Sequence, residues 1–383
     1  MLDRRKFLTA AALAPAFAAY PTLAAAQGER GPRLLFVMQR GAADGLGLLA
    51  PVGDPAYSGL RQQLAAEYDG LPQIGGMFAF HPRLEQMAQM YGRGELLAAH
   101  AVGLSYRDRS HFDSQNLLES GGAQPYARRD GWMNRLVGLL GERRSTALAL
   151  APKIPLALQG TNPASSYAPS ALPDAAEPLI EQAGEMYAAD PLLAGLWQQA
   201  LATREMAGDT GLKNLRDAAK TGELAAALMR GADGARIVML ESNGWDSHAG
   251  QQFQLGNMAG RLDALLAAYA AGMGDTWRDT LVIVATEFGR TARVNGTRGT
   301  DHGTASAAFL AGGAVKGGRI LTDWPGLSDG ALYEGRDLKP TASLEALIAG
   351  AVAGHFGLNH ARTLATLFPD RALSPVTGLV RGG

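Results

Sequence analysis

The chain contains no cysteine. The fold therefore has no disulfide bond, no thiolate metal ligand and no cysteine nucleophile, and it does not need an oxidising compartment. An excess of one charge is also lacking, because 35 basic and 36 acidic residues give a formal net charge of -1. Nucleic-acid-binding proteins carry a basic surface excess, so we expect no nucleic acid partner.

A long hydrophobic run is lacking as well. The apolar stretch from Leu8 to Tyr20 is rich in alanine and interrupted by Pro15, so we expect no stable membrane span. Arg4 and Arg5 precede this stretch, and small residues that suit cleavage follow it at 24–26. The pattern indicates a twin-arginine signal peptide over residues 1–26, and hence a periplasmic or secreted protein carried by the Tat export machinery. An uncleaved N-terminal anchor is the alternative.

The remaining chain, 27–383, is long for one domain but normal for a single α/β enzyme. Short apolar runs, several of them rich in β-branched residues, predict buried strands, and amphipathic stretches between them predict helices. The predicted strands are 32–39, 96–102, 237–240, 281–285 and 305–310. This order predicts a doubly wound α/β fold with a mostly parallel sheet. The alternation of predicted strands and helices is absent over 147–233, and we interpret this segment as an α-rich insertion or cap over the sheet.

Carboxylates and imidazoles follow the predicted strands one after another. In an open α/β sheet, the carboxyl ends of parallel strands meet at one edge, which is where ligands bind. Oxygen and nitrogen donors gathered there predict a divalent metal site. The alternatives are a salt-bridged loop after the strand at 281–285 and a surface aspartate with an exposed histidine after the strand at 237–240. The metal-ligand candidates are Asp44, Asp246, His248, Glu287, Asp301 and His302.

A helix is predicted to begin at Ser110, because Ser110 and Asp113 have the spacing of a capping box. The first turn of a helix offers free N–H groups and a positive dipole to an anion. Arg109 and His111 flank this start. Two interpretations stay open, namely that Ser110 only caps the helix, or that the segment has a catalytic or anion-binding role.

Five segments carry a resemblance to a known family: RGAADGL, HFDSQNLLESG, NGWDSHAGQ, TEFGRTARVNGTRGTDHG and EGRDLKPT. In order and spacing, and with the twin-arginine start, the chain resembles the bacterial exported family called domain of unknown function 1501 over nearly its whole length. That family is similar to the alkaline phosphatase and sulfatase superfamily. The resemblance implies an alkaline phosphatase-like fold with metals held by Asp and His residues at the carboxyl ends of strands.

The resemblance also implies roles for single residues. By position, Asp44 is similar to the first metal ligand, Asp246 and His248 to a middle pair, Glu287 to a later acid and His302 to a late histidine. Ser110 stands where the superfamily has its nucleophile, with His111 beside it as a further catalytic candidate. Glu287-Phe288 stands where an Asp-His pair is usual. Catalytic Arg290, with Arg109, would hold substrate oxygens, since a guanidinium matches them bidentately.

The leading functional hypothesis is hydrolysis of a phosphate or sulfate ester, with an anionic small molecule or glycan ester as substrate. One or two divalent ions, with zinc, manganese, magnesium and calcium as candidates, would activate Ser110 or a water and neutralise charge on the transferred group. The alternative is a secreted binding or assembly protein that keeps the fold without turnover.

Replacement of the twin arginine tests export. With Arg4→Lys and Arg5→Lys together, we expect the precursor to stay in the cytoplasm, because the Tat pathway reads the arginine pair rather than the charge alone. Immunoblots of cytoplasmic and periplasmic fractions measure this, and Arg30→Lys is the matched control outside the signal. An unchanged periplasmic yield would contradict the prediction.

Overall fold

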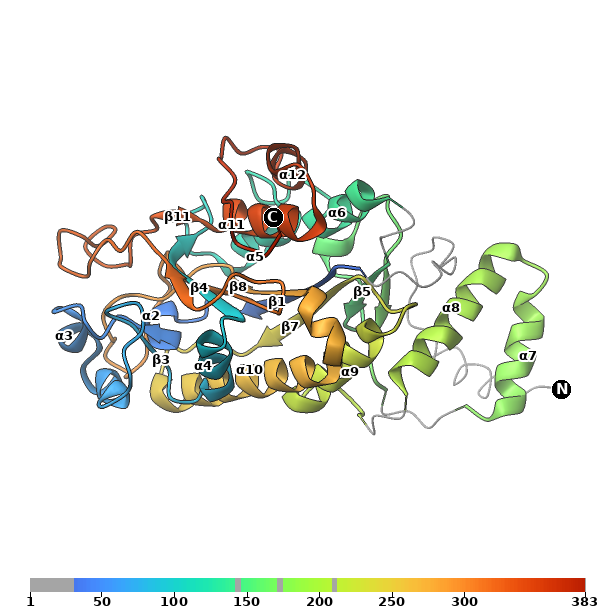
Figure 1. The fold of residues 1–383 in the computed structure, drawn as a ribbon, viewed down its shortest axis with the longest axis horizontal. Helices are drawn as coiled ribbons and strands as arrows, with labels where there is room; N and C mark the ends of the chain where they lie inside the picture. Colours follow the sequence, from blue (N-terminus) through green and yellow to red (C-terminus); the bar gives the residue numbers. More distant parts are fainter. Residues whose placement is uncertain (1–30, 142–145, 171–174, 209–211, 383) are drawn as a thin grey trace.

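The computed structural model describes residues 31–141, 146–170, 175–208 and 212–382. The signal-peptide prediction lies outside these residues. Among them, no helix is both long and apolar enough to cross a bilayer. The predicted mature domain forms a layered α/β fold, with a central sheet between two groups of helices (Figure 1).

The sheet contains nine strands in the described residues, and it is mixed but mostly parallel. Strand β9 (Ser306–Ala311) is the antiparallel member, paired with β8 (Thr280–Thr286) and β4 (Leu96–Gly103). β11 (Ala342–Ser343) pairs with β4 beside the main order. That order is β10 (Arg319–Leu321), β4 (Leu96–Gly103), β9 (Ser306–Ala311), β8 (Thr280–Thr286), β1 (Arg33–Arg40), β7 (Ile237–Asn243), β5 (Ala147–Leu150) and β6 (Ser165–Tyr167). The five predicted strands are confirmed within one to three residues.

Helices cover both faces, as a doubly wound fold requires. One face carries α4 (Glu85–Gly92), α9 (Ala218–Arg230) and α10 (Gln251–Met273); the other carries α5 (His111–Ser120), α6 (Trp132–Leu140), α11 (Leu344–Phe356) and α12 (His360–Leu367). Alternate residues of β1 supply the two cores: Leu35 and Val37 enter one, and Leu34, Phe36 and Met38 enter the other. A strand buried on both faces must be apolar throughout, which is the pattern of its sequence.

A smaller subdomain follows β1. It contains α2 (Gly45–Leu48), α3 (Tyr57–Arg61) and the hairpin of β2 (Leu49–Ala50) with β3 (Ala79–Phe80). Because α2 begins so soon after β1, this subdomain marks the end of the sheet at which β1 finishes (Figure 1).

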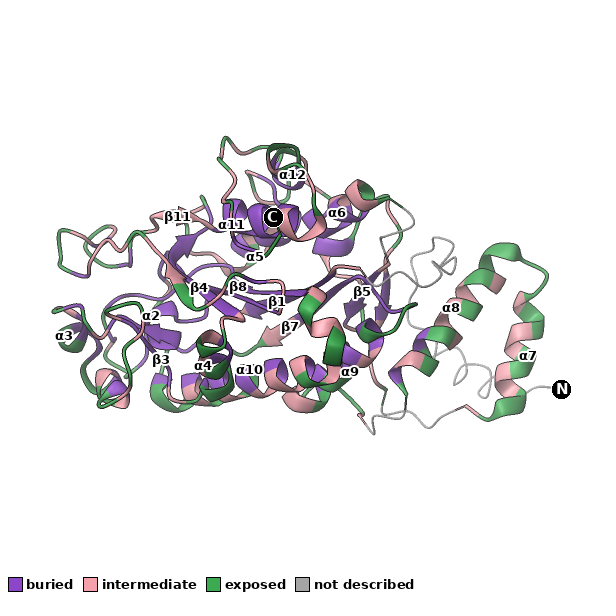
Figure 2. Ribbon diagram, viewed as in Figure 1, coloured by how far each residue is buried: buried purple, intermediate pink, exposed green. Residues whose placement is uncertain are grey.

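The stretch 147–233 differs from the prediction of an α-rich insertion. Its first part supplies β5 and β6 to the sheet, because strands of three or four residues are too short to leave a clear periodic signal. Helix α9 packs against α10. Among the described elements of this stretch, α7 (Glu177–Tyr187) and α8 (Pro191–Ala207) project from the body, and they are largely exposed (Figure 2). They lie at the opposite end of the molecule from α2 and α3, so they do not cover the carboxyl end of β1.

His100 in β4 is completely buried and must be neutral to keep its two hydrogen bonds. Its Nε2 lies 2.9 Å from the carbonyl oxygen of Leu49 and therefore donates. Its Nδ1 accepts the N–H of Ala101 at 2.7 Å. Burial lowers the pKa of His100 to about 4. Protonation would convert the acceptor Nδ1 into a second donor facing an N–H group.

We expect His100 to destabilise the protein as the pH falls below 6.5, because the unfolded chain binds this proton readily and the folded chain does so only near pH 4. Between pH 7 and 5 the loss is about 2 kcal/mol of unfolding free energy. Urea unfolding at both pH values measures it. His100→Gln should lessen the loss, while the matched variant His360→Gln should not. NMR titration showing that the His100 ring gains its proton near pH 6.5 would refute this.

Candidate functional site

Asp246 lies in the loop that follows β7, close to the end of β1. Trp245 anchors this loop, since its ring is buried and its backbone N–H donates to the carbonyl oxygen of Arg40 at 3.3 Å. Gly41, directly after β1, lets the two loops approach: a Cβ there would lie 2.7 Å from the backbone nitrogen of Asp246, and its φ is 113°. Only glycine tolerates both the contact and this φ well. The Asp246 side chain remains partly exposed.

His111 is the first residue of α5, and the predicted helix start is confirmed. Ser110 is the N-cap, with its hydroxyl accepting the N–H of Asp113 at 3.5 Å. His111 Nδ1 lies 2.9 Å from Glu287 Oε1, and its Nε2 lies 3.4 Å from Asp246 Oδ2. The Nε2 atom is buried and has no hydrogen-bond partner in the described structure. The hydrogen bond with Glu287 is the main cause that raises the pKa of His111.

His302 reaches the site through a hairpin-like turn between β8 and β9, in which Arg290 and His302 form an antiparallel bridge. Its Nδ1 lies 3.0 Å from the carbonyl oxygen of Arg109, and its Nε2 lies 3.4 Å from Asp246 Oδ1. Arg109 adopts a left-handed backbone, with φ of 57°, just before the helix cap. Burial, followed by the nearby His111, lowers the pKa of His302.

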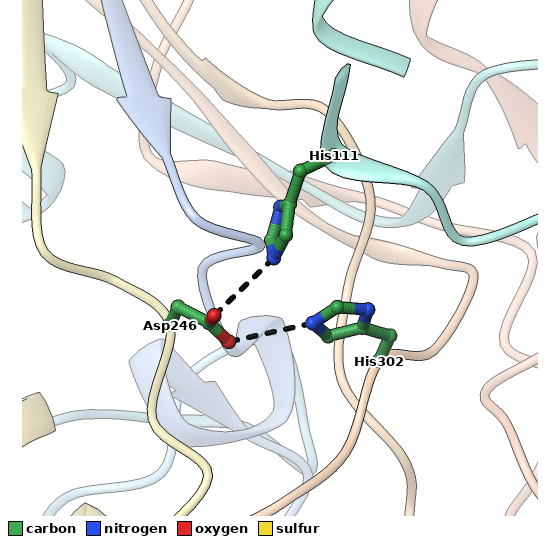
Figure 3. Close-up of side chains that lie close together, drawn as sticks. All are labelled: His111, Asp246 and His302. Atoms are coloured by element: carbon green, nitrogen blue, oxygen red, sulfur yellow. Dashed lines mark ion pairs between the residues drawn. The ribbon is translucent and has the colours of Figure 1, made fainter. Parts of the chain in front are cut away.

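His111, Asp246 and His302 form what we call the metal cluster (Figure 3). One ligand atom from each lies within 4.8 Å of the other two. Both rings are directed at the Asp246 carboxylate, although the three residues come from separate segments of the chain. His248 borders the cluster, because its Nε2 lies 3.0 Å from both Asp246 Oδ1 and His302 Nε2.

The three imidazoles share one arrangement. Each Nδ1 faces an oxygen that can only accept: Glu287 for His111, Asp301 for His248 at 3.1 Å, and the Arg109 carbonyl for His302. Nδ1 therefore carries a proton, and in the neutral ring Nε2 presents a lone pair toward Asp246. Histidine ligands of metals in proteins are oriented in this way by an outer acceptor. The chemistry of these donors suits a divalent ion such as zinc or manganese.

Glu287 is fully buried beneath His111 and stands outside the metal cluster. Its Oε1 accepts the Gly41 N–H and the Gln115 amide, each at 2.9 Å. Burial acts to raise the pKa of Glu287, but the bonds from His111 and Gln115 lower it overall. Sequence reasoning missed Gln115, although it lies four residues after His111 and therefore on the same face of α5.

Phe288 forms an apolar wall of the site. Its ring stacks on His111 with centroids 4.9 Å apart, and its centroid lies 5.2 Å from that of His302. Where the resemblance suggests a histidine, this chain thus places a hydrocarbon surface that excludes water from one side of the imidazoles.

The two arginines predicted to hold substrate are bound to carboxylates of the protein. Arg290 is buried and donates to Asp246 Oδ1 at 2.6 Å. Burial acts to raise the pKa of Asp246, and Arg290 outweighs it, so that the pKa is lowered. Arg109 donates to Asp337 at 2.7 Å and to Glu334 at 2.6 Å. Both guanidiniums thereby fix side chains and loops around the cluster.

Asp44 is not brought into the metal cluster, contrary to its predicted role as a metal ligand. Its Oδ1 accepts from Arg61 at 2.9 Å, and its Oδ2 accepts from both Arg61 and Gln251. The chain turns into α2 directly after Asp44, which buries the carboxylate among these partners. Of the other predicted ligands, Asp246 and His302 belong to the cluster, while His248 and Asp301 lie at its exposed rim.

A family model described as protein of unknown function (DUF1501) matches residues 32–368. The chain belongs to the DUF1501 family. The resemblance stated from the sequence is therefore confirmed at the family level. No curated protein matches this DUF1501 chain.

Several solved structures are similar to it at low identity. A TAB5 alkaline phosphatase mutant with Mg bound has 11% identity, covers 86% of this chain and 99% of its own, and gives a TM-score of 0.37. Ps i-CgsB in complex with k-i-k-neocarrahexaose has 10% identity, covers 76% of this chain and 68% of its own, and gives a TM-score of 0.35. The C-terminal periplasmic domain of EcEptC from Escherichia coli, in complex with Zn, has 8% identity, covers 74% of this chain and 73% of its own, and gives a TM-score of 0.32.

Substitution of the two cluster histidines tests the metal site. With His111→Ala or His302→Ala, we expect the affinity for Zn²⁺ or Mn²⁺ to fall by more than about 100-fold, because each removes a ligand. The double variant should bind little more weakly than either single variant, since ligands of one ion act as a unit. Isothermal titration and the metal-dependent rise in melting temperature measure this.

His360→Ala is the matched control for that experiment, because His360 begins α12 away from the cluster. Elemental analysis of protein purified without chelators should also find a divalent metal in the wild type. Absence of stoichiometric metal, together with no thermal shift on adding any divalent ion, would contradict the site.

Proposed function

We propose that this protein is an exported, metal-dependent hydrolase of phosphate or sulfate esters. The observation that carries the proposal is the convergence of the His111, His248 and His302 Nε2 atoms on Asp246. Each ring is fixed from behind by an oxygen acceptor. Such an arrangement costs stability in a loop region unless it binds something, because it gathers partly desolvated polar groups that do not pair fully.

The residues present fit a divalent cation. The buried Nε2 of His111 lacks a hydrogen-bond partner, and a metal ion is the partner that its lone pair suits. His111, Asp246 and His302 would hold the ion, with His248 near enough to join them. Two or three imidazoles with one carboxylate favour zinc or manganese over magnesium or calcium, which prefer oxygen ligands throughout.

A bound divalent ion would supply Lewis-acid chemistry, polarising an ester oxygen and lowering the pKa of an oxygen nucleophile. The other parts belong to the protein. The first turn of α5 offers free backbone N–H groups beside the cluster, and these groups would bind the nonbridging oxygens of an anionic ester. Phe288 keeps water from one side of the rings, which strengthens electrostatic interactions in the site.

Ser110 is the proposed nucleophile. It immediately precedes His111, and its oxygen accepts a long bond of 3.5 Å from the Asp113 N–H. An accepting hydroxyl keeps its own proton free to leave, and in the described part of the chain no hydrogen bond fixes that proton elsewhere. This hydroxyl, next in sequence to His111, would attack phosphorus or sulfur and break the bond to the alcohol of the ester, and the departing alcohol would take up the proton that Ser110 loses.

The enzyme hypothesis is tested with aryl phosphates and aryl sulfates. We expect turnover by protein reconstituted with zinc or manganese, and none after the metal has been removed. Asp246→Asn and Ser110→Ala should each lower kcat by at least about 100-fold, because they remove a ligand and the nucleophile. Asp370→Asn, a matched change at a surface ion pair with Arg128, should leave kcat unchanged.

The outcomes separate the two functional hypotheses. Stoichiometric metal binding without turnover of either ester class would favour the binding or assembly protein. Turnover that survives both metal removal and Asp246→Asn would refute the metal-dependent mechanism.

A further inference from the structure

A chain of hydrogen bonds between polar side chains begins at Asp246 and leads away from the metal cluster into the protein interior. We call the four buried residues of this chain of hydrogen bonds, Arg290, Thr300, Gln251 and Asp44, the buried relay. We propose that Thr300 and Gln251 are positioning residues that fix Arg290, and through it Asp246. The inference rests on the proposed function only in treating Asp246 as a metal ligand.

Arg290 is the first member of the relay. Its side chain is completely buried, and Asp246 is its ion-pair partner among the described residues. Its Nε donates to Thr300 Oγ1 at 3.2 Å, and its Nη2 donates to the Thr300 carbonyl oxygen. Two contacts to a single residue fix the plane of the guanidinium, because the fork of donors is rigid. The remaining nitrogen, Nη1, is thereby directed at Asp246 Oδ1.

Thr300 connects Arg290 to Gln251 through its hydroxyl group. The Thr300 hydroxyl accepts from Arg290, so its own proton is free to be donated, and it goes to Gln251 Oε1. Gln251 Nε2 donates to Asp44 Oδ2. The orientation of this amide is forced, because an ionised carboxylate only accepts and therefore must face the NH₂ group. Thr300 and Gln251 are both fully buried, so water cannot replace a lost partner easily.

The ion pair of Asp44 with Arg61 forms the base of the relay. Arg61 also donates to the carbonyl oxygen of Thr291 at 3.2 Å, the residue that follows Arg290. The same ion pair therefore supports the relay at both ends: at Gln251 through a side chain, and beside Arg290 through the backbone. From Arg290 to Asp44 the three hydrogen bonds run in one direction, and bonds aligned in this way strengthen one another in a low-dielectric interior.

The relay decides which way the Asp246 carboxylate faces. With Oδ1 fixed by Arg290, rotation of the carboxylate is restricted, and Oδ2 is turned toward His111 Nε2. Without Thr300 Oγ1, the guanidinium loses one of the contacts that set its plane. Asp246 would then keep its charge but lose its fixed direction.

Thr300→Val is the decisive variant, since it keeps the shape of the side chain and removes the hydroxyl. We expect its affinity for Zn²⁺ to fall by about 10-fold, the lower end of the effect of losing a direct partner of a ligand, because Thr300 acts on Asp246 one step further out, through Arg290. Thr300→Ser, which restores the hydroxyl, should bind close to wild type. Gln251→Met, which removes the next link at similar volume, should weaken binding in the same sense. Isothermal titration of the metal-free proteins with Zn²⁺ measures all three.

Thr280→Val is the matched control. Thr280 is equally buried, and its hydroxyl donates one hydrogen bond, to the Thr276 carbonyl at 2.8 Å, but it begins β8 rather than following it. It should lose stability without losing Zn²⁺ affinity. If the wild type binds Zn²⁺, an equal affinity in Thr300→Val, or an equal loss in Thr280→Val, would overturn the relay.

A crystal structure of Thr300→Val separates failure of the relay from failure of the proposed function. We expect the contact between Arg290 Nη1 and Asp246 Oδ1, 2.6 Å in the wild type, to lengthen or break. An unchanged contact would refute the relay whether or not the wild type binds Zn²⁺. A wild type that binds no metal, together with a broken contact in the variant, would refute the proposed function and leave the relay standing.

Discussion

The site depends on the ion pair between the buried guanidinium of Arg290 and the partly exposed carboxylate of Asp246. A guanidinium that is fully removed from water costs several kcal/mol unless a carboxylate and further acceptors compensate for it. Asp246 supplies the charge, and Thr300 supplies the remaining acceptors. The same carboxylate faces the histidines, so the requirement to neutralise a core charge also fixes the group at the centre of the site. Stability and the geometry of the candidate metal centre are thus coupled.

Close backbone contacts provide the rest of the rigidity. A Cβ at Gly299 would lie 2.1 Å from the carbonyl carbon of His248, and one at Gly41 would lie 2.7 Å from the Asp246 nitrogen. The loops after β1, β7 and β8 therefore pack main chain against main chain. Loops packed in this way resist displacement more than loops joined only by long side chains. The segments that carry Asp246, His248 and His302 are consequently held in place, and His111 reaches them from the start of α5.

The charges around the cluster are balanced locally. Glu287 lies beneath His111, Asp301 beside His248, and Asp337 and Glu334 beside Arg109. This leaves the predicted substrate-binding arginines engaged by the protein's own carboxylates. An anionic ligand would then meet the helix N-terminus and any bound cation before it meets a free guanidinium.

The sequence by itself determined five of the nine strands of the main sheet, the start of α5 at Ser110, the family, and the fact that donors follow successive strands. These features are local, because apolar runs and capping residues act over a few neighbouring positions. It did not show β5 and β6, which are too short to leave a period. The sequence also predicted Asp44 as a metal ligand and His111 as a catalytic residue, whereas the structure brings His111, and not Asp44, beside Asp246 and His302.

Tertiary structure decided which of these donors meet, because position after a strand gives the edge of the sheet but not the direction of each side chain. Asp44 and Asp246 both follow a strand. The chain enters α2 directly after Asp44, and this carboxylate forms an ion pair with Arg61. The Asp246 carboxylate instead lies against the histidines, because Gly41 lets its loop approach β1 and Arg290 binds its side chain. The partners that make this difference lie far away in sequence, and only the packing of the folded chain brings them into contact.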